Sequence, residues 1–257
     1  MSFSADWLSL REPADHAARD AGLVRKLAEW GAGRSLRITD LGSGTGSTFR
    51  ALAEAVPGRW TMVEIDRGLL TRLWAAHGDD PRVAEGLPLD LATQLDEVWK
   101  TDPDLVSGSA LIDLASAQWL DALADGLPDR TALYMALSYD GKETWRPAPP
   151  HEERALAAFH AHQAGDKGFG AALGPDATTY LAERLAARGW NVSIARSDWR
   201  LAPEDGPLIR ELAAGSIQAV EETGALPAQA LSDWAEGRLA ASHVEIGHLD
   251  LLALPPV

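Results

Sequence analysis

An apolar strand that runs directly into an acidic, glycine-rich turn is the feature that most constrains the fold of this chain. Residues 38–46 read ITDLGSGTG, and a segment with helical spacing follows them. A second apolar strand, residues 60–65, then ends in acidic residues. This order predicts a βαβ unit that binds a nucleoside, because glycines let a ligand approach the backbone and a carboxylate accepts hydrogen bonds from ribose hydroxyls.

The spacing of the glycines narrows the choice of ligand. A dinucleotide-binding turn reads G-x-G-x-x-G and places a pyrophosphate on the helix N-terminus. Here Gly42, Gly44 and Gly46 form a G-x-G-x-G pattern, and Asp40 precedes the first of them by two positions. A carboxylate at this place disfavours a pyrophosphate and favours a cationic amino-acid group. The pattern therefore argues against a nicotinamide-dependent oxidoreductase.

Residues 40–46 (DLGSGTG) together with residues 63–66 (VEID) resemble motifs I and II of the class I S-adenosylmethionine (SAM) dependent methyltransferases. The resemblance covers residues 36–140 by motif and the rest of the chain only by topology. It implies a Rossmann-like α/β fold with a central, mostly parallel seven-stranded sheet, helices on both faces and an inserted cap after strand five. It also implies SAM as the cofactor and S-adenosylhomocysteine (SAH) as the product.

The same resemblance implies which residues bind the cofactor. The predicted cofactor site consists of Asp40, Gly42, Ser43, Gly44, Gly46, Glu64, Ile65, Asp90, Leu91 and Ser107. Glu64 would hold the ribose hydroxyls, and Asp66 is the alternative for this role. Ile65 would pack on the adenine. Asp90 and Leu91 would read the adenine edge, although Asp90 is equally suited to cap a helix.

Alternating periodicity along the chain predicts a parallel sheet covered on both faces. Strands are expected at about residues 36–41, 60–65, 82–87, 104–110, 131–138, 190–196 and 249–254. Helices are expected at about residues 15–30, 47–56, 67–77, 91–99, 117–124, from 152, 177–188, 207–223 and 228–236. We interpret residues 1–257 as one domain with an N-terminal helical segment (1–34), a cofactor-binding core (35–140), a substrate cap (141–174) and the C-terminal part of the sheet (175–257).

The amino-acid composition limits the kinds of partner that the protein can bind. The 23 basic and 38 acidic residues give a net charge of −15, and this disfavours nucleic acid, whose binding depends on basic side chains. The absence of cysteine excludes disulfides, thiolate metal sites and a cysteine nucleophile. Neither a membrane span nor a signal peptide is indicated, so we expect a cytoplasmic protein. A homodimer is compatible with the sequence.

The candidate catalytic residues are Asp113, Tyr139, His160 and His162. Asp113 follows the fourth predicted strand, where it could act as a base or bind the substrate, or simply begin a helix. Residues 107–113 lack the Asn/Asp-Pro-Pro-aromatic motif of methyltransferases that act on the amino groups of nucleobases or glutamine. Histidine suits general base catalysis near neutral pH. On a helix His160 and His162 would point about 200° apart, which disfavours a shared metal ion, so no metal site is predicted.

The sequence therefore predicts SAM-dependent methyl transfer to an oxygen or nitrogen nucleophile of a small molecule. A protein or RNA methyltransferase is one alternative, and a SAM- or nucleotide-binding protein without catalysis is another. Arg19 could pair with a carboxylate at the methionine end of SAM, but a position on a helix surface is the simpler interpretation of this residue.

Overall fold

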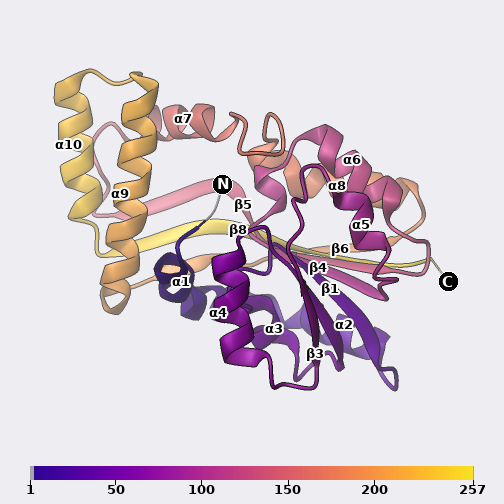
Figure 1. Ribbon diagram of the computed structural model, residues 1–257. Coiled ribbons are helices and arrows are strands. Elements are labelled where there is room, and N and C mark those ends of the chain that lie inside the picture. The colour runs from indigo at the N-terminus through magenta and orange to yellow at the C-terminus, as the bar shows by residue number, and fades with distance from the viewer. Residues whose placement is uncertain (1–2, 257) are drawn as a thin grey trace.

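One twisted sheet organises the protein in the computed structural model, which describes residues 3–256 (Figure 1). Its eight strands within these residues follow the order β3-β2-β1-β4-β5-β8-β6, and a short β7 pairs with β8. The strands are β1 (Leu36–Leu41), β2 (Gly58–Val63), β3 (Val83–Leu87), β4 (Leu105–Ser109), β5 (Ala132–Arg146), β6 (Asn191–Arg196), β7 (Trp199–Leu201) and β8 (His243–Leu254). Strands β1 to β5 pair in parallel, and β8 runs antiparallel to its neighbours.

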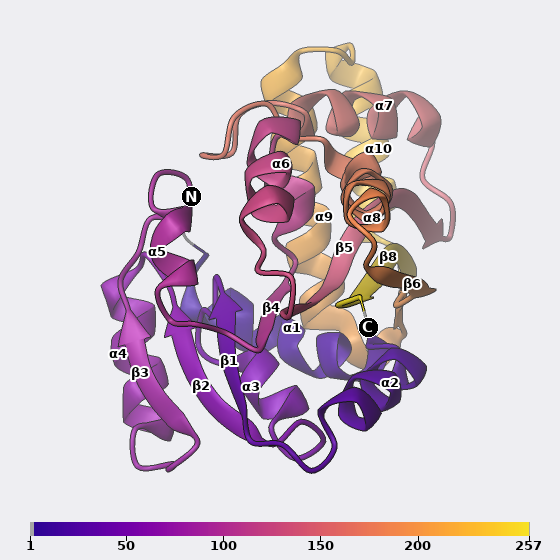
Figure 2. The same ribbon diagram turned by 90° about the vertical axis from the view of Figure 1, so that its right-hand side faces the viewer.

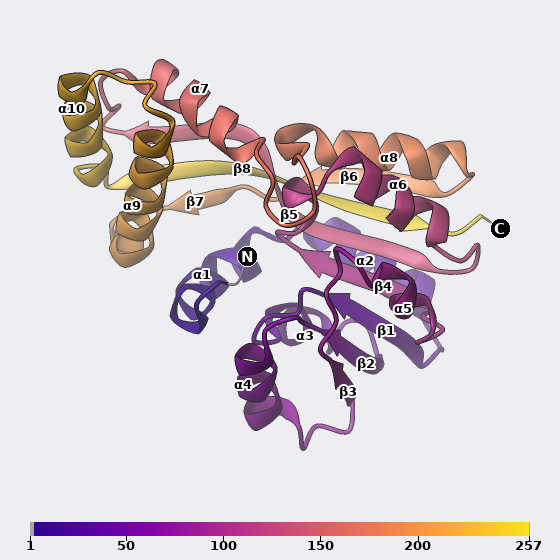
Figure 3. The same cartoon turned by 45° about the horizontal axis from the view of Figure 1, so that its top comes forward.

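Helices cover both faces of the sheet (Figures 2 and 3). The helices are α1 (Ala5–Ala18), α2 (Ala21–Gly31), α3 (Ser47–Leu52), α4 (Arg67–His77), α5 (Leu95–Trp99), α6 (Ala117–Gly126), α7 (Glu152–Gln163), α8 (Ala177–Ala187), α9 (Gly206–Thr223) and α10 (Ala228–Leu239). Apolar side chains of α5, α6 and α8 form one core with the sheet, and those of α2, α3 and α4 form a second core on the opposite face. Burial on both faces explains why the first half of β5 reads as a nearly continuous apolar run.

The structure confirms most predicted elements, lengthens two strands and shortens two helices: α3 ends at Leu52 rather than at residue 56, and α5 begins at Leu95 rather than at residue 91. Helix α4 spans the predicted residues 67–77, because Asp66 caps its first turn. Strand β5 continues past the predicted end at residue 138 as far as Arg146, and β8 begins at His243 rather than near residue 249. The pairing register of these two strands shifts twice. The added residues are largely polar, so the apolar pattern of the sequence did not predict them as strand.

The N-terminal segment forms two helices where one helical region was predicted. Ser4 caps α1, and the chain turns at Arg19 and Asp20. The Asp20 carboxylate accepts a hydrogen bond from the backbone N–H of Leu23, 2.7 Å away, and so begins α2. This capping signal was present in the sequence, but the helical spacing on both sides of it masked the break.

The extended halves of β5 and β8 leave the main sheet and carry α7, α9 and α10 (Figures 1 and 3). Helix α7 lies in the segment predicted as an insertion after strand five, whereas α9 and α10 come from the C-terminal part of the chain. Together the three helices form a helical layer with the strand extensions beside the carboxyl ends of the parallel strands. Within residues 3–256 no helix combines the length and apolar character needed to cross a bilayer.

Candidate functional site

A cavity of about 310 Å³ lies at the carboxyl ends of β1, β2 and β4. Open parallel sheets bind ligands at this edge, where the strand order reverses between β1 and β4. The predicted cofactor residues that line the cavity are Gly42, Ser43, Gly44, Glu64, Ile65, Asp90 and Leu91. The fold thus brings together three short segments that are separate in the sequence and were each predicted to touch the same ligand.

The glycine-rich turn supplies backbone rather than side chains to the cavity. Gly42 and Gly44 have φ angles of 61° and 54°, in the left-handed region that favours glycine. The backbone N–H of Gly44 donates to Oε2 of Glu64 at 2.9 Å, which ties the turn to the end of β2. Gly46 begins α3 at φ 89° and does not line the cavity, so it shapes the turn from outside.

Glu64 and Asp66 have different surroundings. Glu64 is buried at the cavity wall, and its two carboxylate oxygens accept backbone hydrogen bonds from Gly44 and Asp66. Each oxygen has a second lone pair available for a ligand hydroxyl. The Asp66 carboxylate accepts from the backbone N–H groups of Gly68 and Leu69 and caps α4. The arrangement favours Glu64 for a ribose.

The other side of the cavity is formed by Ile65 and the turn after β3. Ile65 is 53% exposed although it is a large apolar side chain, so it offers a face for a planar ligand. Both Asp90 oxygens are engaged locally, one with the backbone N–H of Ala92 and the other with the Thr93 hydroxyl. Asp90 does not cap a helix as considered above, because α5 begins only at Leu95; it closes a turn over residues 91–94 and lies on the cavity wall.

A buried polar group lies directly behind the glycine-rich turn. Oδ1 of Asp40 accepts a hydrogen bond of 2.7 Å from the Ser107 hydroxyl, and both residues are fully buried. Oδ2 of Asp40 has no partner among residues 3–256. Burial raises the pKa of Asp40 to about 6, against the opposing effects of Ser107 and of the Arg19 charge. Ser107 thus orients Asp40, and neither of these two residues lines the cavity.

Arg19 is buried, with 9% of its surface exposed, and does not lie on a helix surface. Its Nη2 donates to the Ser109 hydroxyl at 2.8 Å, and Ser109 lines the cavity. Its Nε and Nη1 have no hydrogen-bond partner within the part of the chain that the structure describes. Arg19 does not itself line the cavity. Burial raises the pKa values of Asp40 and Tyr134, and the positive charge of Arg19 opposes this effect.

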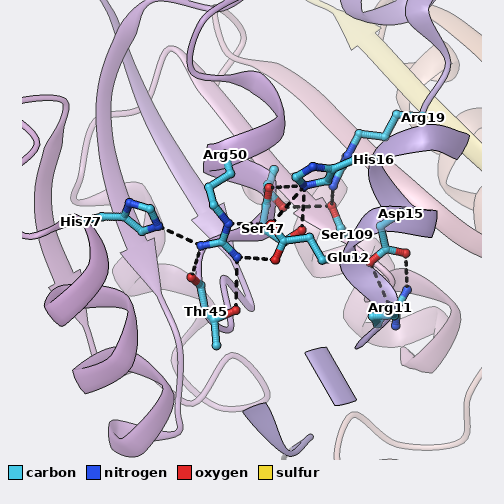
Figure 4. A network of polar contacts seen from close by, with 11 residues as sticks. Arg11, Glu12, Asp15, His16, Arg19, Thr45, Ser47, Arg50, His77 and Ser109 are labelled. Atoms are coloured by element: carbon cyan, nitrogen blue, oxygen red, sulfur yellow. Dashed lines mark hydrogen bonds and ion pairs between the residues drawn. The ribbon is translucent and has the colours of Figure 1, made fainter. Parts of the chain in front are cut away.

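Helix α1 is tied to the glycine-rich turn by a polar network (Figure 4). The Arg50 guanidinium donates to Glu12 at 2.6 Å and to the Thr45 carbonyl at 2.6 Å, and its Nη1 lies 2.8 Å from Nε2 of His77. His16 lies 3.1 Å from the carbonyl and hydroxyl oxygens of Ser47. Burial raises the pKa of Glu12, but the Arg50 guanidinium outweighs this and holds that pKa below its usual value.

This network presents three α1 side chains to the cavity that the sequence analysis did not select: Leu8, Arg11 and Asp15. Arg11 and Asp15 form two parallel hydrogen bonds of 2.9 and 3.0 Å, and Trp199 of β7 donates its indole N–H to Asp15. The spacing of Arg11 and Asp15, one helical turn apart, was the available signal. The family resemblance implied that residues 7–19 fold over the methionine end of SAM or the substrate, but it did not indicate which face of the helix meets the cavity.

The four candidate catalytic residues do not line the cavity. Asp113 lies in a short 3₁₀ helix (Ile112–Leu114), between Leu111 and Leu114, which do line it. Its Oδ1 is buried without a partner among the described residues. Burial raises the pKa of Asp113 to about 6, and the charge of Arg11 opposes this shift.

Tyr139, His160 and His162 lie in or beside the helical layer. The Tyr139 hydroxyl is 3.0 Å from Nε2 of His160 and donates to Glu143, and burial raises the Tyr139 pKa above its usual value. His162 faces away from this cluster and lies 3.0 Å from Glu222. The two histidines thus have separate partners, as their helical spacing predicts. No group of three His, Asp or Glu residues within residues 3–256 could hold a metal ion.

Comparison with known structures identifies the fold of this protein, whereas comparison with family models and curated sequences finds no match. No protein-family model and no curated protein matches this sequence. A cyclopropane-fatty-acyl-phospholipid synthase-like protein from Lactobacillus casei superposes with a TM-score of 0.56 at 15% identity, over 99% of this chain and 95% of that one. A proposed methyltransferase from Bacillus halodurans gives 0.55 at 13% identity, over 91% and 99%.

A cyclopropane synthase from Mycobacterium tuberculosis gives a TM-score of 0.52 at 14% identity, over 98% of this chain and 94% of that one. A mycolic acid cyclopropane synthase with the same TM-score and identity is complexed with SAH. At such identities the comparison establishes the fold, and it agrees with the strand order described above. The protein therefore has the Rossmann-like fold of the class I SAM-dependent methyltransferases.

Proposed function

We propose that this protein is a SAM-dependent methyltransferase that acts on an oxygen or nitrogen nucleophile of a small molecule. The observation that carries the proposal is the cavity at the carboxyl end of β1. There the glycine-rich turn, Glu64 and the Asp90–Leu91 segment converge, with unpartnered polar atoms of Asp40 and Arg19 immediately behind them. The glycine-rich turn would face the methionine portion of SAM, Glu64 the ribose and the Asp90–Leu91 segment the adenine. Asp40 and Arg19 would lie near the ammonium and carboxylate groups.

The cavity residues fit SAM in their chemistry. The backbone of Gly42 and Gly44 would approach the methionine portion, and Glu64 would accept from the ribose hydroxyls. Ile65 and Leu91 would contact the adenine. Asp40 and Arg19 would attract the ammonium and carboxylate groups through the Ser109 side of the wall. SAM, when bound, supplies an electrophilic methyl group on a sulfonium.

The chain itself then has to place the acceptor, exclude water and hold a proton. The apolar side chains of Leu8, Leu111 and Leu114 line the cavity and would exclude water. Asp113 is our candidate for the proton acceptor, because its unpartnered oxygen and its pKa of about 6 suit a base near neutral pH. It would reach the acceptor by a side-chain rotation from its place between Leu111 and Leu114.

A small acceptor is favoured over a macromolecule. The cavity is lined by apolar side chains from several elements, and the net charge of −15 does not suit an RNA backbone. The alternative of a SAM-binding protein without catalysis is favoured by one observation: Asp113, Tyr139, His160 and His162 do not line the cavity. A transfer assay with labelled methyl groups separates these possibilities.

Calorimetric titration of the purified protein with SAM, SAH and NAD tests the proposed cofactor. We expect saturable binding of SAM and SAH with one site per chain and no binding of NAD, since the glycine spacing and Asp40 disfavour a pyrophosphate. Binding of NAD alone, or of none of the three, would contradict the proposal. Incubation with methyl-labelled SAM and a panel of small hydroxyl and amine compounds then tests catalysis.

SAM affinity should depend on pH through Asp40. With a pKa of about 6, Asp40 is mostly protonated at about pH 5 and mostly ionised at about pH 7, and only the ionised form pairs with the SAM ammonium. We expect the apparent affinity to rise about tenfold across this range, in proportion to the ionised fraction. Burial raises the Asp40 pKa in the folded state above the usual value of 3.8. Between about pH 4 and pH 6 the folded protein therefore holds a proton that the unfolded chain has lost, so the protein without SAM should become less stable as the pH rises through this range.

Titrations at several pH values check this expectation, with Asp40→Asn and Asp113→Asn in parallel. The first variant should bind SAM weakly and without this pH dependence. The second removes a carboxyl group with the same pKa of about 6 that has no part in the proposed SAM contacts, so it should keep the wild-type profile. A flat profile in the wild-type protein, or a flattened one in Asp113→Asn, would rule out Asp40 as the cause.

A further inference from the structure

Two basic side chains, Arg11 and Lys167, line the same cavity. Both are far in the sequence from the segments that would hold the cofactor. Arg11 comes from α1, and Lys167 comes from the glycine-rich loop that follows α7. Neither belongs to the turns after β1, β2 and β3. A protein with a net charge of −15 therefore directs positive charge into its cavity from two separate elements.

Arg11 is fixed in place and retains hydrogen-bonding capacity. Its Nε and Nη2 donate to Asp15, and its guanidinium lies 4.9 Å from the centre of the Trp199 ring. Its side chain is only 11% exposed. Nη1 donates to no atom of residues 3–256, so its two N–H groups remain for a ligand. A guanidinium held in this way loses little conformational entropy when it binds an anion.

Lys167 is positioned by His162, in the last turn of α7. Its Nζ donates to the carbonyl oxygen of His162 at 3.0 Å and lies 3.5 Å from Nδ1 of the same residue. Hydrogen bonds from Gln218 and His162 lower the pKa of Glu222, and the charge of Lys167 contributes to this shift. One of the three N–H donors of Lys167 is left for other groups.

SAM adds positive charge to a cavity that two basic side chains already line. SAM carries a net positive charge, because its sulfonium and ammonium outweigh one carboxylate. Of the acidic side chains that line the cavity, Asp15 is paired with Arg11, and Glu64 and Asp90 lie at the ribose and adenine end. Although Asp15 balances its charge, Arg11 keeps Nη1 for a ligand, and Lys167 keeps an N–H donor in the region left for the acceptor. An anionic group on the acceptor would accept hydrogen bonds from both.

The remaining walls of this region are apolar. Phe3, Leu8, Leu114 and Phe169 line it, and Phe169 is held edge-on against Trp119 with 5.2 Å between ring centres. Such walls suit a hydrocarbon or aromatic body. We propose that the methyl acceptor is a small, largely apolar molecule with a carboxylate or phosphate group, and that Arg11 and Lys167 bind this group. This inference rests on the proposed methyltransferase function and specifies its substrate class.

The test is calorimetric titration of the SAH-saturated protein with benzoate, phenyl phosphate and the neutral benzamide. We expect saturable binding of at least one anion and none of benzamide, and the tighter anion identifies the group. Lys167→Gln should weaken that binding about tenfold, as expected for loss of a charge-assisted hydrogen bond, while SAH affinity stays unchanged. Lys142→Gln is the matched control, because Lys142 is exposed and lies outside the cavity.

Three results would overturn the inference: equal binding of benzamide and benzoate, no saturable binding of either anion, or the same loss in Lys142→Gln as in Lys167→Gln. The preceding SAH titration keeps the two proposals apart. If SAH binds and the anions do not, only the substrate class is wrong. If SAH itself does not bind, the methyltransferase function fails, and the substrate class fails with it.

Discussion

Replacing Glu64 with alanine should weaken the binding of SAM and SAH about 100-fold. A hydrogen bond to a charged group contributes about 1.5–3 kcal/mol, and Glu64 would accept from both ribose hydroxyls. The substitution also removes the acceptor of the Gly44 and Asp66 backbone N–H groups, so the glycine-rich turn loses its link to β2. Calorimetric titration with SAM and SAH measures the loss directly.

Asp66→Ala is the control for this experiment. Asp66 is also acidic and stands two residues away, but its carboxylate caps α4. Removing the cap should lower the free energy of unfolding by about 1 kcal/mol and leave SAM affinity nearly unchanged. If Asp66→Ala lost SAM binding and Glu64→Ala retained it, the ribose would be assigned to the wrong carboxylate. Wild-type affinity in both variants would contradict the proposed cofactor site altogether.

The cofactor half of the site was predictable because its signals are local. A glycine at positive φ, an acidic residue after an apolar strand and a helix cap are each encoded within a few residues. The parallel sheet then brings the ends of β1, β2 and β3 to one edge without further information. For the same reason α4, whose cap and apolar spacing are both local, has the bounds that its sequence predicts.

The part of the site that involves α1 depends on contacts between distant segments. Arg50 pairs with Glu12 and Arg19 donates to Ser109, and both contacts join α1 or its end to elements that follow much later in the chain. Such pairs leave no periodic signature in the sequence. Arg19 illustrates the consequence: its helical context favoured a surface position, whereas the packing of α1 and α2 on the sheet buries it.

The helical layer could not be predicted from the sequence for a related reason. The extensions of β5 and β8 pair with each other across a long stretch of sequence, and their polar residues read as loop when each strand is considered alone. Tyr139 of β5 and His160 of α7 are joined there by a 3.0 Å contact. The structure thus explains their proximity by packing of the layer, and their predicted catalytic role stays a prediction.

Arg238→Gln should destabilise the protein by about 3–5 kcal/mol, the range for removing one partner of a buried ion pair. Arg238 is fully buried, donates to Glu143 at 2.8 Å and to Glu152 at 2.7 Å, and lies between the rings of Trp145 and Trp234. Its loss leaves the Glu143 carboxylate, only 5% exposed, without its cation. Urea unfolding followed by circular dichroism gives the change.

The control is Arg130→Gln, because Arg130 pairs with Asp102 at the surface and such pairs contribute about 0–1 kcal/mol. If Arg238→Gln loses no more free energy of unfolding than this control, water must replace the guanidinium in the helical layer.

The double variant Arg238→Gln/Glu143→Gln distinguishes electrostatics from packing. If an uncompensated carboxylate causes the loss, removing it should restore part of the stability, so the double variant should be more stable than the sum of the single changes predicts. If the two changes are additive, the stacking of Arg238 between the tryptophans accounts for the loss instead.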